Sequence, residues 1–269
     1  MRGASADSLA RLTEQLGSAI ESGADAARIA DDLFAVSALL RKEPSLRRLA
    51  TDLSLQPAAK SDFARGLLAE QLDGGSMDLV ASAVAQRWAA TRDLADALEE
   101  LGVIAVVKGA DREGQADALE DELFGFGRLV SENPELRDAL SDPARSAEDK
   151  HTLLAGLLEG RATGATIRLA KQAVVSSHRT VNVAVEQYQK VAANNRNRLV
   201  ATVRVANELA DADRQRLQGA LARQYDRPVH LNVVVDPEVV GGVKVEIGDD
   251  VIDGTVASRL DDARRRLAG

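Results

Sequence analysis

The sequence predicts a mostly α-helical chain that ends in a small α+β domain, and three observations lead to this prediction. The 269 residues are 45% hydrophobic but only 3% aromatic, so alanine and leucine, which favour helices, supply most of the apolar content. A set of proline, lysine and leucine residues recurs at an offset of 90 residues, which indicates a duplicated module. After residue 194 the apolar spacing becomes that of strands. We therefore expect two tandem helical-bundle repeats followed by a β-α-β-β-α domain.

The first helical module is expected to span residues 1–92. Two amphipathic helices open it, separated by Gly23, and Pro44 ends the second because the residue before a proline disfavours the helical conformation. Ser61 and Asp62 are expected to cap a later helix. After a loop at 73–76, a further helix is expected to carry Trp88. The apolar residues of the first two helices recur at three- and four-residue spacing: Leu9, Leu12, Leu16, Ile20, Ile29, Leu33, Val36 and Leu40.

The second helical module is expected to span residues 93–193 and to repeat the first in register. Proline, arginine and lysine are not needed to make a helix amphipathic, so their recurrence at a fixed offset indicates duplication and not shared periodicity. A long helical segment with an apolar stripe from Ile167 to Ala192 closes this module. The pairs that recur include Leu39 with Leu129, Pro44 with Pro134, Leu46 with Leu136, Arg47 with Arg137, Lys60 with Lys150, and Leu67 with Leu157.

The C-terminal domain is expected to span residues 194–269 and to form a small sheet with helices on one face. A polar break at Asn194–Arg198 precedes an alternating strand at 199–205. A helix runs from Asp211 to about Asp226, and a second alternating strand follows at 229–235. The chain then forms a hairpin over 241–255, and Thr255 is expected to cap a final helix that ends near Leu267.

The hairpin carries a cluster of glycines and aspartates with structural roles. The Gly241-Gly242 pair marks a place where the backbone needs a positive φ or a close approach. Gly248 supplies a turn between two apolar runs, and Asp253-Gly254 ends the second run.

Composition and motifs exclude several kinds of chemistry. A net charge of −8 is opposite to the basic footprint that nucleic-acid binding needs. The chain has no cysteine and no phosphate-binding glycine loop, and its three histidines have no metal-ligand spacing. Asp249, Asp250 and Asp253 could bind Mg²⁺, but turn chemistry accounts for the same residues. No nucleophile or base accompanies them, so we predict a non-catalytic protein with no cofactor and no metal. A small metal-dependent enzyme that uses this loop remains an alternative hypothesis.

The hairpin sequence Gly-Gly-Val-Lys-Val-Glu-Ile-Gly-Asp-Asp-Val-Ile-Asp-Gly-Thr resembles the C-terminal signature of the delta subunit of bacterial F-type ATP synthases. That family includes the mitochondrial oligomycin-sensitivity-conferring protein. Residues 132–143, which contain an Asn-Pro and an Asp-Pro pair, look like the N-terminal helical domain of the same family. A usual member has one such domain, so the resemblance makes the first module an addition.

The resemblance implies a stator subunit in the peripheral stalk that couples rotation to ATP synthesis. The helical part would bind alpha, and possibly beta, subunits of the catalytic head, and the C-terminal domain would hold the b subunit. The chain would then lie peripherally on the cytoplasmic side of a bacterial membrane, without inserting into it. A helical-repeat adaptor of an unrelated complex remains the alternative.

Two apolar stripes in the second module are candidate partner-binding faces, because an apolar helical groove can accept an amphipathic helix. One stripe contains Ile104 and Val107, and the other contains Ile167, Ala170 and Val174. The same residues are also explained as core, since apolar side chains are usually buried.

Overall fold

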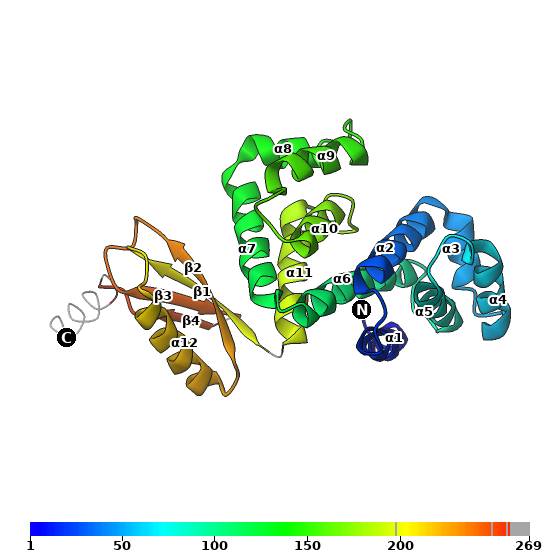
Figure 1. The fold of residues 1–269 in the computed structure, drawn as a ribbon, viewed down its shortest axis with the longest axis horizontal. Coiled ribbons are helices and arrows are strands. Elements are labelled where there is room, and N and C mark those ends of the chain that lie inside the picture. The colour runs from blue at the N-terminus through cyan, green and yellow to red at the C-terminus, as the bar shows by residue number, and fades with distance from the viewer. Residues whose placement is uncertain (197, 249, 257, 259–269) are drawn as a thin grey trace, which may run out of the picture. The chain divides into compact units, whose positions relative to one another are not determined.

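The computed structural model describes residues 1–196, 198–248, 250–256 and 258. The chain divides into two compact units, Met1–Ala192 and Ala193–Gly269, which we call the helical unit and the α/β unit (Figure 1). No helix in the part of the chain that the structure describes combines the length and the apolar character needed to cross a membrane.

The helical unit is built from short helices whose ends follow local signals in the sequence. The Asp25 carboxylate accepts hydrogen bonds from the N–H groups of Ala27 and Arg28 and so caps α2. Pro44, Pro57 and Pro134 each occupy the first turn of a helix, where a missing N–H costs nothing. The helices are α1 (Ala4–Glu21), α2 (Ala26–Lys42), α3 (Pro44–Ala50), α4 (Pro57–Leu68), α5 (Gly74–Ala85), α6 (Asp93–Arg112), α7 (Ala116–Glu132), α8 (Pro134–Ser141), α9 (Ala147–Leu158), α10 (Gly164–Ala173) and α11 (Val181–Asn195).

The duplication predicted from the sequence is present in the backbone. Helices α2 to α5 begin at residues 26, 44, 57 and 74, and helices α7 to α10 begin at 116, 134, 147 and 164, which is an offset of 90 residues each time. The four helices therefore begin at equivalent positions in the two copies, although Pro57 at the start of α4 corresponds to Ala147 at the start of α9. The mostly helical fold with two tandem repeats and a small α/β end is confirmed.

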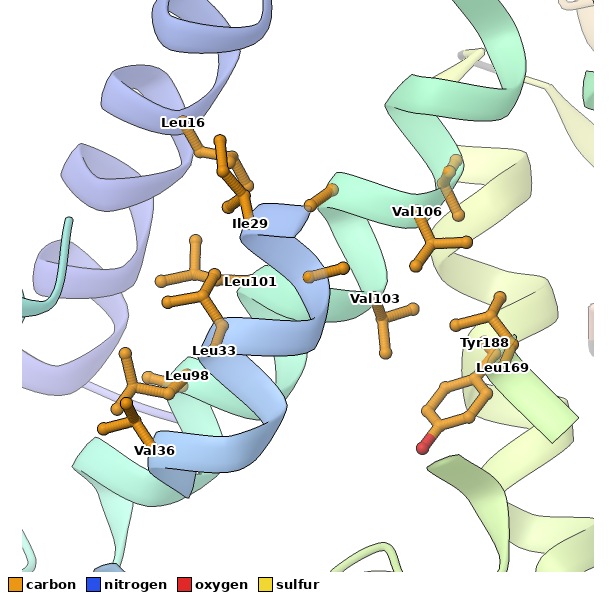
Figure 2. Close-up of a cluster of buried hydrophobic side chains, with 14 of the residues drawn as sticks. Leu16, Ile29, Leu33, Val36, Leu98, Leu101, Val103, Val106, Leu169 and Tyr188 are labelled. Atoms are coloured by element: carbon orange, nitrogen blue, oxygen red, sulfur yellow. The ribbon is translucent and has the colours of Figure 1, made fainter. Parts of the chain in front are cut away.

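Helix α6 is used by both copies. It packs against α1 and α2 on the side of the first module and against α7 and α10 on the side of the second. Leu98 and Leu101 lie with Leu33 of α2, whereas Val103 and Val106 point toward α10 and α11 (Figure 2). The boundary between the sequence modules, at residues 92 and 93, thus falls immediately before a helix whose two sides belong to one continuous core.

The first module differs from expectation at two helix ends. Helix α4 begins at Pro57, not at Ser61-Asp62, because proline is pre-organised for the first helical turn. The Ser61 hydroxyl instead donates to the Ala81 carbonyl at 2.8 Å. Helix α5 begins at Gly74, inside the expected loop, because Asp73 caps it, and it ends at Ala85. Trp88 therefore lies beyond that helix, and its indole N–H donates to the Ala83 carbonyl at 2.9 Å.

The α/β unit is a four-stranded sheet in the order β2-β1-β3-β4. Strands β1 (Leu199–Val205) and β2 (Val229–Val235) are parallel and joined by α12 (Asp211–Tyr225). Strand β3 (Val243–Ile247) is antiparallel to β1, and β4 (Asp250–Asp253) is antiparallel to β3. The expected hairpin thus supplies two strands, one more than the predicted element order. Leu217 and Leu221 of α12 pack on the sheet face that carries Val203, Val245 and Leu231.

Only the start of the predicted final helix falls on described residues. The Thr255 hydroxyl accepts a hydrogen bond from the Ser258 N–H at 3.2 Å, which is the geometry of an N-cap. The rest of that helix, up to Leu267, lies outside the described residues.

Candidate docking surfaces

Among the residues that the structure describes, no group of three or more histidine, cysteine, aspartate or glutamate side chains could hold a metal ion. His151 contacts the Lys171 carbonyl through Nε2 at 3.0 Å, and burial lowers the pKa of its imidazole. The hairpin carboxylates act as turn acceptors: Asp250 accepts from the Tyr225 hydroxyl, and Asp253 accepts from both the N–H and the hydroxyl of Thr255. Asp249, the third carboxylate considered for Mg²⁺, lies outside the described residues.

One buried polar cluster joins the two helical modules. The Glu99 side chain on α6 is 3% exposed and forms an ion pair with Arg41 at the end of α2. Gln172 of α10 and the Tyr188 hydroxyl of α11 each donate to Glu99 Oε1 at 3.2 Å. The Ser177 N–H donates to the other carboxylate oxygen, also at 3.2 Å. A single side chain on the shared helix therefore holds residues from both copies.

The protonation behaviour of this cluster follows from its contacts. Burial by itself raises the pKa of Glu99, but Arg41 and the donors from Gln172 and Ser177 outweigh it and hold the pKa below its usual value. Burial, and then the nearby Glu99 charge, raise the pKa of Tyr188. Glu99 is thus ionised and fully hydrogen-bonded at neutral pH, the condition under which a buried charge is tolerated.

The predicted partner-binding residues lie on α6 and at α10, and they differ in exposure. Val107 and Ala170 are 2% and 0% exposed. Ile104, Ile167 and Val174 are partly buried and pack on the same core. A partner helix could reach the partly buried residues, while Val107 and Ala170 could only support such a surface from beneath.

Ile167 also lines a cavity of about 360 Å³ between the two modules. Asp31 and Phe34 of α2 form its other side. The Arg168 guanidinium makes two hydrogen bonds to the Asp31 carboxylate, at 2.7 and 3.2 Å, across this cavity. The surface beside α10 is therefore partly covered by the first module.

A second apolar groove, which was not predicted from the sequence, lies on α3 and α4 of the first module. It has a volume of about 590 Å³, and Leu49, Phe63 and Leu67 are 36%, 44% and 44% exposed there. Leu39, Leu46 and Leu67, which line this groove, belong to the residues that recur in the repeat, and this recurrence is the sequence signal that could have pointed to the groove. The spacing of these leucines alone does not show whether they are exposed or buried. The groove is lined by Leu39, Glu43, Ser45, Leu46, Leu49, Phe63, Leu67, Leu68 and Gln71.

The glycine signature of the hairpin has a direct steric explanation. Gly242 has a φ of 83°, and a Cβ at this position would lie 2.4 Å from the Gly254 carbonyl oxygen. Gly248, with a φ of 59°, makes the turn between β3 and β4. A side chain at Gly254 would approach the Val243 carbonyl oxygen to 3.2 Å. Gly241 has a φ of 155°, and it accepts a hydrogen bond from the Val256 N–H at 2.9 Å.

Comparison with known proteins gives a consistent result. The model of the family described as ATP synthase delta (OSCP) subunit matches residues 104–267. The ATP synthase subunit delta of Nocardioides sp. (strain ATCC BAA-499 / JS614) is 55% identical over 269 residues, which cover 100% of this chain and 98% of that protein. The protein of the same name from Streptomyces coelicolor is 47% identical over 270 residues, with coverages of 100% and 98%.

These relatives are as long as this chain, so the first module is shared with them. The match to the family model begins at residue 104, so the first module lies outside that match. The Nocardioides and Streptomyces proteins, in contrast, match this chain along its whole length, the first module included. Among solved structures, a chain of the Toxoplasma gondii mitochondrial ATP synthase hexamer matches 62% of this chain and 95% of its own length. Its identity of 18% and TM-score of 0.35 are too low to establish a shared fold.

Proposed function

This chain belongs to the family of ATP synthase delta (OSCP) subunits, and we propose that its helical unit binds the catalytic head while its α/β unit holds the b subunit. As a member of that family it is a non-catalytic subunit of the peripheral stalk, and it belongs to a membrane-bound complex as a peripheral component. We place it on the cytoplasmic side of the bacterial membrane.

The physical task of such a subunit is to resist torque. Rotation of the central shaft pulls the catalytic head in the same direction, and the stalk must stop the head without doing chemistry. Tight binding at two ends and stiffness between them are the properties required. The observation that supports this stiffness is the Glu99 cluster, which ties α2, α6, α10 and α11 of the helical unit into one body through buried polar contacts.

At the head end, we propose that N-terminal helices of alpha subunits bind along α6 and α10. The partly buried side chains of Ile104, Ile167 and Val174 would contact them, with Val107 and Ala170 supporting the surface from the core. An amphipathic helix in an apolar groove is a common recognition mode, which supports this assignment. Beta subunits could contribute further contacts.

For the first module, we propose that it adds a second contact or stiffens the stalk, and the shared helix favours stiffening. Deleting residues 6–90 would not test this cleanly, because α1 and α2 cover Leu98 and Leu101 of α6, both of which are 0% exposed. Their exposure would destabilise the second module as well.

A pull-down from detergent-solubilised membranes tests the assignment of the two ends. The full chain is compared with a variant that lacks residues 193–269. The full chain should recover alpha, beta and b subunits, and the shortened chain should recover alpha and beta without b. Retention of b by the shortened chain would assign the b contact to the helical unit, contrary to the proposal.

The alternative of a helical-repeat adaptor in an unrelated complex is not favoured. Proteins named as ATP synthase subunits match the whole length of this chain, the first module included.

A further inference from the structure

One end of the sheet in the α/β unit brings together exposed valines and acidic loops. Val205 pairs with Val235 of β2 and with Val243 of β3, so the carboxyl ends of β1 and β2 and the start of β3 lie side by side. The loops 206–210 and 236–242 leave the sheet at this same end. Val256 joins them, because its N–H donates to the Gly241 carbonyl at 2.9 Å.

The valines at this end are unusually exposed. Val240 is 82% exposed, Val256 is 44% exposed and Val235 is 41% exposed. Single exposed apolar residues are ordinary on protein surfaces, but a group of them at one end of a small sheet is typical of an interaction site.

The charge around these valines has one sign. Glu208, Asp211 and Glu238 are exposed and form no ion pair with any residue that the structure describes. The nearby basic groups are already paired. Arg204 lies 3.9 Å from Asp236 and 3.8 Å from Glu246, and Lys244 lies 3.1 Å from Glu246.

We propose that this valine–acidic end binds a basic amphipathic helix of the b subunit. The end is defined by three valines and three carboxylates: Val235, Val240, Val256, Glu208, Asp211 and Glu238. The valines would take the apolar face of the helix, and the carboxylates would meet lysine or arginine side chains along its edges. The inference rests on the proposed function, because it names the surface through which the α/β unit holds b.

The edge strand β4 supplies a matched control. Val251 of β4 is 60% exposed and pairs with Glu246, away from the loops that form the valine–acidic end. It is as exposed as the proposed contacts and belongs to the same unit, so a Val251→Glu substitution adds the same charge to a surface outside the proposed site.

The test is a titration of the full chain with the soluble stalk region of the b subunit from the same synthase. Val240→Glu is expected to weaken binding about thirty-fold, the loss typical of an interface hot spot. Glu208→Lys combined with Glu238→Lys should weaken binding by a similar factor and flatten its dependence on salt, because screened attraction is removed. Val251→Glu should change the affinity by less than about two-fold. Each variant is first checked for an unchanged melting curve.

Different failures have different meanings. If the unaltered chain does not bind the b stalk, the proposed function fails at this end. If it binds and the Val240, Glu208 and Glu238 variants bind equally well, the proposed surface is wrong while the function stands. Loss of binding on removal of residues 259–269, with Val240→Glu unaffected, would assign the contact to the C-terminal segment and also overturn the inference.

Discussion

The two helical modules share one backbone plan but differ in how they cap a corresponding helix and in what they expose. In the first module Asp32 of α2 accepts the Asp73 N–H, at the start of α5, at 3.0 Å. In the second, Glu122 of α7 occupies the corresponding position and accepts from the N–H and hydroxyl of Thr163 and from the Thr166 hydroxyl. The carboxylate at this position therefore accepts more hydrogen bonds in the second module than in the first.

The exposed apolar side chains are distributed in the opposite way. Leu49, Leu53, Leu55, Phe63 and Leu67 are exposed between α3 and α4 of the first module, whereas no large apolar side chain is exposed over residues 134–158 of the second. The positions of the helix starts and several core leucines therefore correspond in the two copies, while their surfaces differ. Identical folds therefore do not imply identical partners.

The contact between the modules offers the largest expected effect. Replacing Glu99 with alanine leaves Arg41, Gln172 and Tyr188 without their shared acceptor, so the free energy of unfolding of the helical unit should fall by about 3 kcal/mol. Urea denaturation followed by circular dichroism measures this. The control is Glu132→Ala, which removes an exposed pair with Arg128 and should cost less than about 0.5 kcal/mol. Equal losses would mean that the cluster does not join the modules.

A second prediction compares the two capping carboxylates directly. Glu122→Ala removes three hydrogen bonds at the start of α10 and should cost about 2 kcal/mol. Asp32→Ala removes one such bond at the start of α5, together with an ion pair to Arg28 at 3.2 Å, and should cost about 1 kcal/mol. Thermal unfolding of both variants decides the order. A larger loss for Asp32→Ala would show that the number of donors does not set the strength of the cap.

The pH dependence of the Glu99 cluster gives a third prediction. The pKa of Glu99 is lowered on folding, so its contribution to stability is present above the unfolded value of 4.5 and is lost as the pH falls through the folded value. Glu99→Gln cannot ionise, so its stability deficit relative to the unaltered chain at pH 7 should shrink as the pH falls below 4.5. Urea midpoints of both proteins between pH 7 and pH 3 measure this. A deficit that stays constant over that range would contradict an ionised Glu99.

How far the sequence alone could predict these features depends on whether a signal is local. Pro44 and Pro134 start helices through their own geometry, so the repeat and the starts of α3 and α8 could be predicted directly. The Glu99 cluster could not, because Arg41, Glu99 and Tyr188 are far apart in the sequence and nothing local marks them as partners. The groove on α3 and α4 was missed for a related reason, since spacing identifies the apolar face of a helix but not whether another element covers it.

The smallest expected effect tests whether the two surfaces have diverged. Leu67 and Leu157 occupy equivalent positions, but Leu67 is 44% exposed while Leu157 packs against the core. Leu67→Gln should therefore change the free energy of unfolding by less than about 0.5 kcal/mol, and Leu157→Gln should lower it by about 1 kcal/mol, because only the second removes apolar contacts made on folding. Urea denaturation of the two variants side by side measures the difference. Since the substitution and the repeat position are the same, only the surroundings of the side chain differ, and equal costs would mean that the two modules still bury this leucine alike.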